Sequence, residues 1–316
     1  MDSAAQPLSF GQILDRVYRL NREHLRSFLT IAAVPVVVFV LFFVAVLAGM
    51  FLVVRPDQLA HNRPPNSLAL GGLFGVVTVA EIGIMVLFAI YQSAATNAAL
   101  QADSGKRARF TEVYAAAWSK AGRYVWLMVL RALIVAGPII VVVLLVSCAA
   151  LIIATASGNP AANAMIAVVP AFVMAYVVGS IYAVFMLIKL SLAFPACVAE
   201  DLTAWTAIKR SNQLTQGAKG RIFLVGLVVY AAVYVAMMVC EVVFLIVGSA
   251  GSIPLMLMHA NRVFEFIWLG VIGLLFICAL FLVGGASWAI YAATFAVIYH
   301  DQRLRIDPKA ASGAPA

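Results

Sequence analysis

Apolar residues in this chain are grouped into six long blocks that are separated by short polar segments. In chain order the blocks occupy residues 28–54, 69–95, 124–156, 164–194, 222–248 and 263–298. Each block is long enough to supply the roughly 20 apolar residues with which an α-helix crosses the hydrocarbon core of a bilayer. The pattern therefore predicts an all-α integral membrane protein with six transmembrane helices.

The segment before the first block has a different period. Between Leu8 and Phe28, apolar side chains recur at the spacing of one helical face, and charged side chains occupy the other faces. The predicted apolar face comprises Phe10, Ile13, Leu14, Val17, Tyr18 and Leu25. Ser9 and Gln12 have the spacing of a capping box, which marks the helix start. We expect an amphipathic helix along the inner membrane surface, with a cytoplasmic helix folded under the bundle as the alternative.

Segments of the same kind precede the third and fifth blocks, about 100 residues apart. The residues that match at an offset of 100 are Phe10 with Phe110, Gln12 with Glu112, Ile13 with Val113, Leu14 with Tyr114, and Tyr18 with Trp118. A looser third copy begins at Ala204. These copies predict a threefold internal repeat of helix, span and span over about 8–101, 102–200 and 201–306, inside one membrane domain of residues 1–306, with 307–316 as a disordered tail. The alternative is that basic interfacial helices resemble one another without a repeat.

The composition supports the membrane interpretation. Apolar residues make up 65% of the 316 residues and charged residues 11%, against about 25% charged residues in an ordinary globular chain. A soluble fold with this composition would expose large apolar patches to water. A soluble protein is therefore excluded.

The basic residues are distributed unevenly over the two sides of the predicted bundle. Sixteen of the 21 lysines and arginines lie in the two terminal segments and in the connections after the second and fourth spans, and three lie on the opposite side. By the positive-inside bias, both termini and all three amphipathic helices face the cytoplasm. The net charge of +8 thus indicates anionic lipid of the inner leaflet as the partner, and not nucleic acid. The candidate lipid-surface contacts are Arg16, Arg19, Arg22, Arg26, Lys209 and Arg210.

Polar groups inside the apolar blocks are the other candidate functional residues, because an unpaired charge at bilayer depth costs about 2.5–3.5 kcal/mol even on insertion scales. Glu81 lies about twelve residues into the second block, near mid-depth. Farther along the same helix, the polar stripe from Gln92 to Gln101 includes Ser93 and Asn97. Two readings remain open for Glu81: a proton or cation site, and a neutral carboxyl in helix packing, which is preferred. The stripe could pack helices through interhelical hydrogen bonds, which is the commoner outcome, line a vestibule, or contact lipid head groups.

Possible bends in the spans occur at Pro138, at Pro170 and at the pair Gly284-Gly285. Such breaks line substrate sites in many transporters, whereas in long tilted helices they more often permit close packing. Packing is the favoured interpretation here.

Motifs of enzyme chemistry are missing from the sequence. The four cysteines have no paired spacing and the four histidines are isolated, so neither a redox pair nor a zinc-binding helix is indicated. Glu200 and Asp201 are adjacent and would point apart in a helix, so we expect them to serve a helix N-terminus. We expect no enzymatic activity, no cofactor and no metal.

Three stretches together resemble a bacterial family. They are Leu8–Leu20, the run from Phe194-Pro195-Ala196 through Glu200 to Ala207–Ser211, and Tyr299–Arg305. The family is the membrane domain found in glycerophosphoryl diester phosphodiesterases, with its stand-alone relatives. The resemblance implies a six-span module of the bacterial inner membrane, without phosphodiesterase activity because the catalytic domain is absent. We therefore expect a lipid- or envelope-homeostasis module or the membrane partner of another protein; the alternative is a small-solute or ion transporter or channel that uses Glu81 and the polar stripe.

Overall fold

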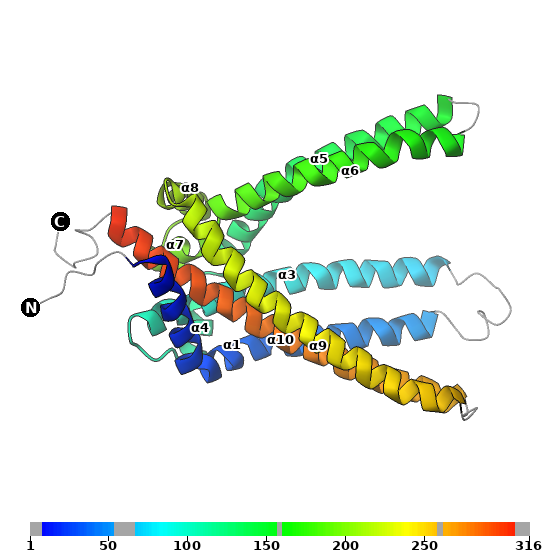
Figure 1. Ribbon diagram of the computed structural model, residues 1–316, viewed down its shortest axis with the longest axis horizontal. Helices are drawn as coiled ribbons and strands as arrows, with labels where there is room; N and C mark the ends of the chain where they lie inside the picture. The colour runs from blue at the N-terminus through cyan, green and yellow to red at the C-terminus, as the bar shows by residue number, and fades with distance from the viewer. Residues whose placement is uncertain (1–7, 54–66, 157–159, 258–261, 307–316) are drawn as a thin grey trace, which may run out of the picture. The chain divides into compact units, whose positions relative to one another are not determined.

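The computed structural model describes residues 8–53, 67–156, 160–257 and 262–306, and all regular structure in these residues is α-helical. The prediction of an all-α protein is confirmed. The helices, shown in Figure 1, are α1 (Phe10–Val53), α3 (Ser67–Asp103), α4 (Phe110–Ser119), α5 (Ala121–Ala156), α6 (Pro160–Lys189), α7 (Ala193–Ala199), α8 (Ala204–Thr215), α9 (Lys219–Leu257) and α10 (Arg262–Ile306).

Six of the described helices are long and apolar enough to cross a membrane: α1, α3, α5, α6, α9 and α10. This confirms the six predicted spans, and the chain is a multi-pass membrane protein. Several helices continue beyond the apolar blocks, because polar residues extend α3 to Asp103 and α10 to Ile306. Hydropathy detects the part of a helix that lies in lipid and not its polar end.

The first helix contains the predicted amphipathic segment. The Ser9 backbone N–H donates to Gln12 Oε1 (2.7 Å) and the Gln12 N–H donates to Ser9 Oγ (3.4 Å), which confirms the capping box. Non-helical dihedral angles at His24 (φ −110°, ψ 16°) separate this segment, residues 10–23, from the span that follows. With α4 before α5 and α8 before α9, the order short helix, span, span occurs three times among the described elements.

The described residues form two compact units, which we treat separately. The α1–α3 unit comprises residues 8–121 and 224–297, and the α5–α8 unit comprises residues 122–223 and 298–306. The helices α9 and α10 thus contribute to both. The predicted threefold repeat is a relationship within the sequence and stays a prediction.

Close helix packing in the α1–α3 unit centres on Gly285 of α10. A Cβ atom at this position would lie 2.8 Å from Val36 Cγ2 of α1, so only glycine permits this approach. The Tyr91 hydroxyl of α3 donates to the Gly285 carbonyl at 2.9 Å. Helices α1 and α3 also lie side by side (Figure 1). Gly285 therefore serves packing, the interpretation favoured from the sequence, whereas a Cβ atom at Gly284 would meet nothing within 4 Å.

The α5–α8 unit contains α5 and α6, which lie side by side, and it places a proline inside each of them. Both helices continue through these prolines. Pro138 has no N–H, so the Ile134 carbonyl loses its partner one turn away. The Tyr182 hydroxyl of α6 donates to that carbonyl at 2.8 Å.

The same arrangement occurs in the α1–α3 unit, where Pro35 lies inside α1. The Tyr114 hydroxyl of α4 donates to the Ile31 carbonyl at 2.7 Å, the acceptor left free four residues before this proline. Burial raises the pKa of the Tyr114 phenol above its ordinary value. The short helix α4 is thereby attached to the span α1.

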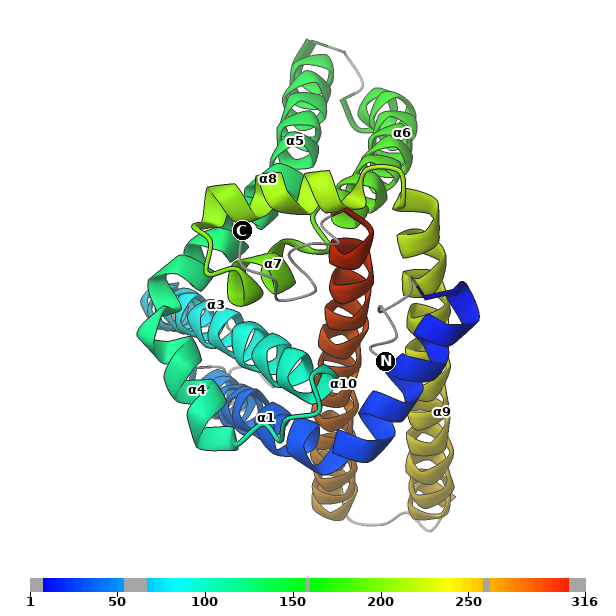
Figure 2. The same cartoon turned by 90° about the vertical axis from the view of Figure 1, so that its left-hand side faces the viewer.

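The core of the α5–α8 unit is built around α7 and α8, which lie against each other (Figure 2). Every residue from Leu190 to Cys197 is buried. In α8 the buried row is Ala204, Ala207, Ile208, Ser211, Leu214 and Thr215. The Thr203 side chain caps α8 by accepting a hydrogen bond from the Thr206 N–H. A local hydrogen bond therefore marks the start of this helix.

Candidate functional site

A polar cluster joins α7, α8 and the end of α10 in the α5–α8 unit. Glu200 directly follows α7. Arg210 Nε of α8 donates to both carboxylate oxygens of Glu200, each at 3.2 Å. The Tyr299 hydroxyl of α10 donates to Glu200 Oε1 at 2.7 Å. The carboxylate and the guanidinium are both largely buried. The cluster therefore ties three sequence-distant segments together with charge-assisted hydrogen bonds.

Asp301 is the centre of a second cluster in the same unit. Its side chain is 0% exposed. Arg221, at the start of α9, lies 3.2 Å from the carboxylate, and Arg305, one turn farther along α10, lies 3.0 Å from it. Gln302 Nε2 also donates to Asp301 Oδ2 at 3.3 Å. A carboxylate this deeply buried requires paired cations, because an isolated buried charge is strongly unfavourable.

Each pair of consecutive spans is joined by an arginine–aspartate pair. The arginine lies before or at the start of the first span, and the aspartate lies near or after the end of the second. Arg123, the third residue of α5, bonds Asp201, which follows α7 and lies 78 residues away. Arg221, the third residue of α9, bonds Asp301 at nearly the same separation. In the α1–α3 unit, Asp103 ends α3 and bonds Arg16 of the first short helix at 2.6 Å. The aspartates recur at about the period of the predicted repeat, although Asp103 and Asp201 lie just beyond residues 101 and 200, where the first two predicted units end.

These aspartates were not predicted from the sequence, although they carry a visible signal. Asp103, Asp201 and Asp301 recur about every 100 residues, each just beyond the apolar stretch of a returning span. A search for matched acids at the repeat period would have found them. The sequence predicted that Glu200 and Asp201 serve the start of α8. In the structure Thr203 caps that helix instead, and arginines bond both carboxylates.

The structure divides the six basic residues that were predicted to contact lipid. Arg16 and Arg210 are directed to carboxylates of the protein, Asp103 and Glu200 respectively. A buried or half-buried carboxylate attracts a guanidinium more strongly than water does. The other four basic side chains are exposed: Arg19, Arg22, Arg26 and Lys209.

The predicted apolar face of the first short helix is also divided. Ile13 and Val17 are buried, together with Leu20, which was not part of the predicted face. Three predicted members, Phe10, Tyr18 and Leu25, are exposed. The helix therefore has two apolar rows, one packed on protein and one free.

All three short helices pack apolar residues on the protein and expose at least one aromatic side chain, and in α8 this is the one exposed large apolar residue. Tyr18 in residues 10–23 is 63% exposed, Trp118 in α4 is 67% exposed and Trp205 in α8 is 53% exposed. Each of these helices also has buried apolar residues, such as Val113 in α4 and Leu214 in α8. Lys209 Nζ lies 5.9 Å from the ring centre of Trp205. Aromatic side chains with a polar atom prefer the membrane–water interface.

Glu81 and Asn97 face in different directions on α3. They are 16 residues apart, which corresponds to a rotation of about 160° around a helix with 3.6 residues per turn. Glu81 is exposed on its helix, whereas the Asn97 amide oxygen accepts from Gln101 Nε2 at 3.1 Å. A single straight path along α3 therefore cannot be lined by both side chains.

The other members of the polar stripe lie toward the protein interior. Ser93 is buried and its hydroxyl donates to the Ile90 carbonyl at 2.8 Å. Gln92 Oε1 is buried and has no hydrogen-bond partner among the described residues. The stripe thus contributes one unsatisfied acceptor to the α1–α3 unit.

Within the part of the chain that the structure describes, cysteines and acidic side chains do not converge as a metal centre. No group of three or more His, Cys, Asp and Glu residues in the described ranges could hold a metal ion. The four cysteines are free thiols, and Cys197 Sγ donates to the Leu202 carbonyl at 3.3 Å. The expectation of a protein without enzymatic activity stays a prediction.

The stretches that carry the family resemblance supply most of the ionic contacts described above. Glu200, Arg210, Tyr299 and Asp301 belong to two of these stretches, and Arg16 belongs to the third. Comparison with protein-family models, with curated proteins and with solved structures gives no match to this chain.

Proposed function

We propose that this chain is a non-enzymatic protein of the bacterial inner membrane that acts in lipid or envelope homeostasis, by itself or as the membrane partner of another protein. We further propose that it is a stand-alone relative of the membrane domain of glycerophosphoryl diester phosphodiesterases. The observation that carries the proposal is the exposed aromatic residue on each of the three short helices. Each helix packs apolar residues on the protein and leaves an aromatic residue exposed.

The topology of the chain supports a common side for these helices. Consecutive spans reverse direction, so the segment before α1, the connection before α5 and the connection before α9 all lie on one side of a membrane that six helices cross. The excess of basic residues on that side supports its assignment to the cytoplasm. Exposed aromatics and basic side chains together are the features by which interfacial helices bind an anionic leaflet.

Contacts inside each unit support a fixed orientation of its short helices, which are residues 10–23 and α4 in the α1–α3 unit and α8 in the α5–α8 unit. Arg16 holds the first short helix to the end of α3, and Arg210 holds α8 to Glu200 after α7. The Tyr114 hydroxyl holds α4 to α1. Because these contacts restrain the short helices, their exposed aromatic side chains are presented to the lipid in a set orientation.

Transport is the second candidate, and one observation favours it. The buried, unpartnered Gln92 Oε1 is the kind of acceptor that a permeating solute or ion uses. The opposed directions of Glu81 and Asn97 count against a path lined by both. We therefore place the lipid function first.

Native mass spectrometry of the detergent-purified protein tests the proposal. The protein is extracted from membranes with equal amounts of phosphatidylglycerol and phosphatidylethanolamine, and bound mass is followed as collisional activation is increased. We expect phosphatidylglycerol to remain bound at energies that remove phosphatidylethanolamine. Loss of both lipids at the same low energy would contradict an anionic-lipid function.

A further inference from the structure

Two lysines share one aromatic ring at the end of α6. Lys189 Nζ lies 4.7 Å from the ring centre of Phe185, and Lys219 Nζ lies 5.1 Å from the same centre. Lys189 is the last residue of α6 and Lys219 the first residue of α9, and all three residues belong to the α5–α8 unit. Both ammonium groups are within the range of a cation–π contact. The two ammonium groups therefore lie within about 10 Å of each other around a single ring.

These two ammonium groups differ from the arginines of the polar clusters. In the described part of the chain, neither lysine forms an ion pair with a carboxylate. Two like charges around one ring repel each other, and the repulsion is stronger beside an apolar span than in bulk water. A bound anion between them would remove this repulsion.

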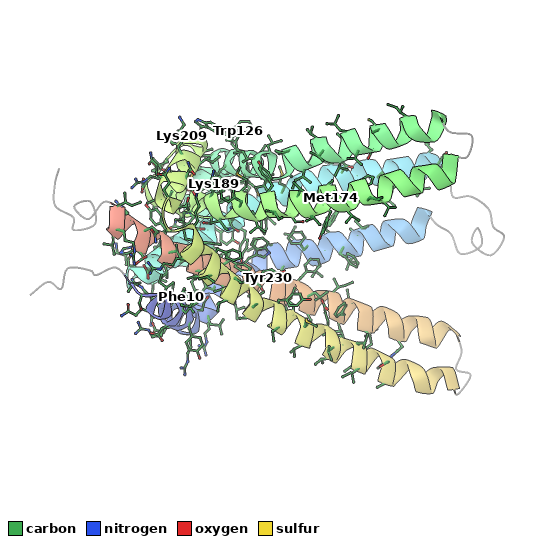
Figure 3. The ribbon with its side chains drawn as sticks, turned by 45° about the horizontal axis from the view of Figure 1, so that its top comes forward. Phe10, Trp126, Met174, Lys189, Lys209 and Tyr230 are labelled. Carbon is green, nitrogen blue, oxygen red and sulfur yellow. The ribbon has the colours of Figure 1, made fainter. Side chains whose placement is uncertain are left out.

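The surface that continues from the lysines is apolar. Residues 189, 185, 181, 178 and 174 follow one another at steps of four and three, so they share one face of α6. Phe185 is 44% exposed, and the three residues below it on this face, Ile181, Val178 and Met174, are all exposed as well. Figure 3 shows Lys189 at one end of α6 and Met174 farther along the same helix.

The length of this face matches one leaflet of a bilayer. Eleven residues separate Lys189 from Val178, which is about 16 Å of helix at 1.5 Å per residue. Half of the roughly 30 Å hydrocarbon core is about 15 Å. A ligand with its anionic group at Lys189 and an acyl chain along the row would reach the bilayer midplane.

We propose that Lys189, Lys219 and Phe185 form a binding site for the phosphate group of an anionic phospholipid, whose acyl chain lies along Ile181, Val178 and Met174. The inference rests on the proposed lipid function and deepens it by locating one site. A membrane lipid, and not free phosphate, is the ligand because the cations continue directly into an exposed apolar row.

The test compares variants by native mass spectrometry after extraction from the same lipid mixture. In Lys189→Gln/Lys219→Gln, we expect retention of phosphatidylglycerol relative to phosphatidylethanolamine to fall by about fivefold for each lysine removed. In Phe185→Leu, which keeps an apolar side chain but loses the ring, we expect a smaller fall. Lys106→Gln is the matched control, because Lys106 is an exposed lysine in the connection between α3 and α4, outside the three short helices, and it should retain lipid as the unaltered protein does.

The outcomes separate the site from the general function. If the unaltered protein holds phosphatidylglycerol and the double variant holds it equally well, the site is wrong and the lipid function stands. An equal loss in Lys106→Gln would also overturn the site, since surface charge alone would then explain binding. Release of the lipid by inorganic phosphate at millimolar concentration would overturn the lipid as ligand. If the unaltered protein retains neither lipid, both proposals fail.

Folding of the variants is controlled separately. Lys189→Arg/Lys219→Arg keeps both charges and should retain phosphatidylglycerol within about twofold, with an unchanged thermal midpoint. If the glutamine pair does not fold, Phe185→Leu and the arginine pair decide the outcome. If Phe185→Leu retains phosphatidylglycerol fully and Lys189→Arg/Lys219→Arg loses it, a site defined by two charges on one ring is contradicted.

Discussion

The Tyr182 hydroxyl donates its hydrogen bond to the Ile134 carbonyl, the acceptor that Pro138 leaves without a helical donor. A free carbonyl is costly in a membrane, because no water is present to satisfy it. The tyrosine of the neighbouring span replaces the missing N–H and also joins α6 to α5. This pairing explains how α5 continues through a proline.

Removal of this hydroxyl should destabilise the protein only while the proline is present. Tyr182→Phe should lower the free energy of unfolding by about 1 kcal/mol, because the Ile134 carbonyl then has no hydrogen-bond donor between the helices. In a Pro138→Ala background the helix regains its own bond, so the same substitution should cost less than half as much. Unfolding in sodium dodecyl sulfate measures both values. Tyr176→Phe is the control, because Tyr176 is exposed on α6 and should show no change; equal costs of Tyr182→Phe in the two backgrounds would reject the pairing.

Neighbouring glycines of α10 should respond differently to alanine. A Cβ atom at Gly285 meets Val36 and Ala32 of α1, whereas a Cβ atom at Gly284 meets nothing within 4 Å. Gly285→Ala should therefore lower the stability by about 1–3 kcal/mol through overpacking. Gly284→Ala should be neutral or stabilising, because alanine favours a helix by about 1 kcal/mol over glycine. Thermal midpoints in detergent make the comparison, and equal effects at the two positions would contradict the close approach of α1 and α10.

Loss of an arginine at the buried Asp301 should be more costly than loss of a surface arginine. Arg221→Gln leaves the carboxylate with one cation fewer in a site without solvent, and we expect a loss of about 2 kcal/mol. Arg19→Gln removes an exposed pair with Asp15 and should change stability by less than about 0.5 kcal/mol. Both are measured by denaturant titration. A loss for Arg221→Gln as small as for Arg19→Gln would mean that Asp301 is accessible to water.

The Tyr114 phenol should make a contribution to stability that depends on pH. Its pKa is raised in the folded protein by burial, so the folded state favours the protonated phenol. The contribution is complete below the unfolded pKa of about 10 and decreases as the pH rises above that value. The difference in thermal midpoint between the protein and Tyr114→Phe should therefore be constant from pH 7 to about 9 and shrink above about 10. A difference that grows above pH 10 would have the wrong sign.

The spans and the first helix start could be predicted because their causes are local. Twenty apolar residues in a row have one stable solution in lipid, and the bonds between Ser9 and Gln12 need only a three-residue spacing. Leu20 was missed because the first short helix has two apolar rows, and a single-face pattern merges them. The sequence shows where apolar residues recur but not which row contacts protein.

The roles of Arg16 and Arg210 could not be predicted from local pattern. Asp103 lies 87 residues from Arg16, and only the fold brings the two side chains together. Arginines on an amphipathic helix are typical of lipid contact, so a local reading assigns them to the membrane surface. The buried Tyr299 hydroxyl on Glu200 is equally remote in sequence, at 99 residues. Long-range ion pairs require the positions of the spans to be known first.

The central claim is that the short helices lie at the membrane surface, and depth-resolved tryptophan quenching tests it most directly. Single-tryptophan variants keep Trp118 or Trp205, with the other four tryptophans replaced by phenylalanine, and are reconstituted with lipids brominated at different depths. We expect the strongest quenching of both residues by bromines near the headgroup, weak quenching by bromines near the chain ends, and partial protection from aqueous iodide. Quenching by iodide as strong as for free tryptophan, without any quenching by brominated lipid, would contradict the claim.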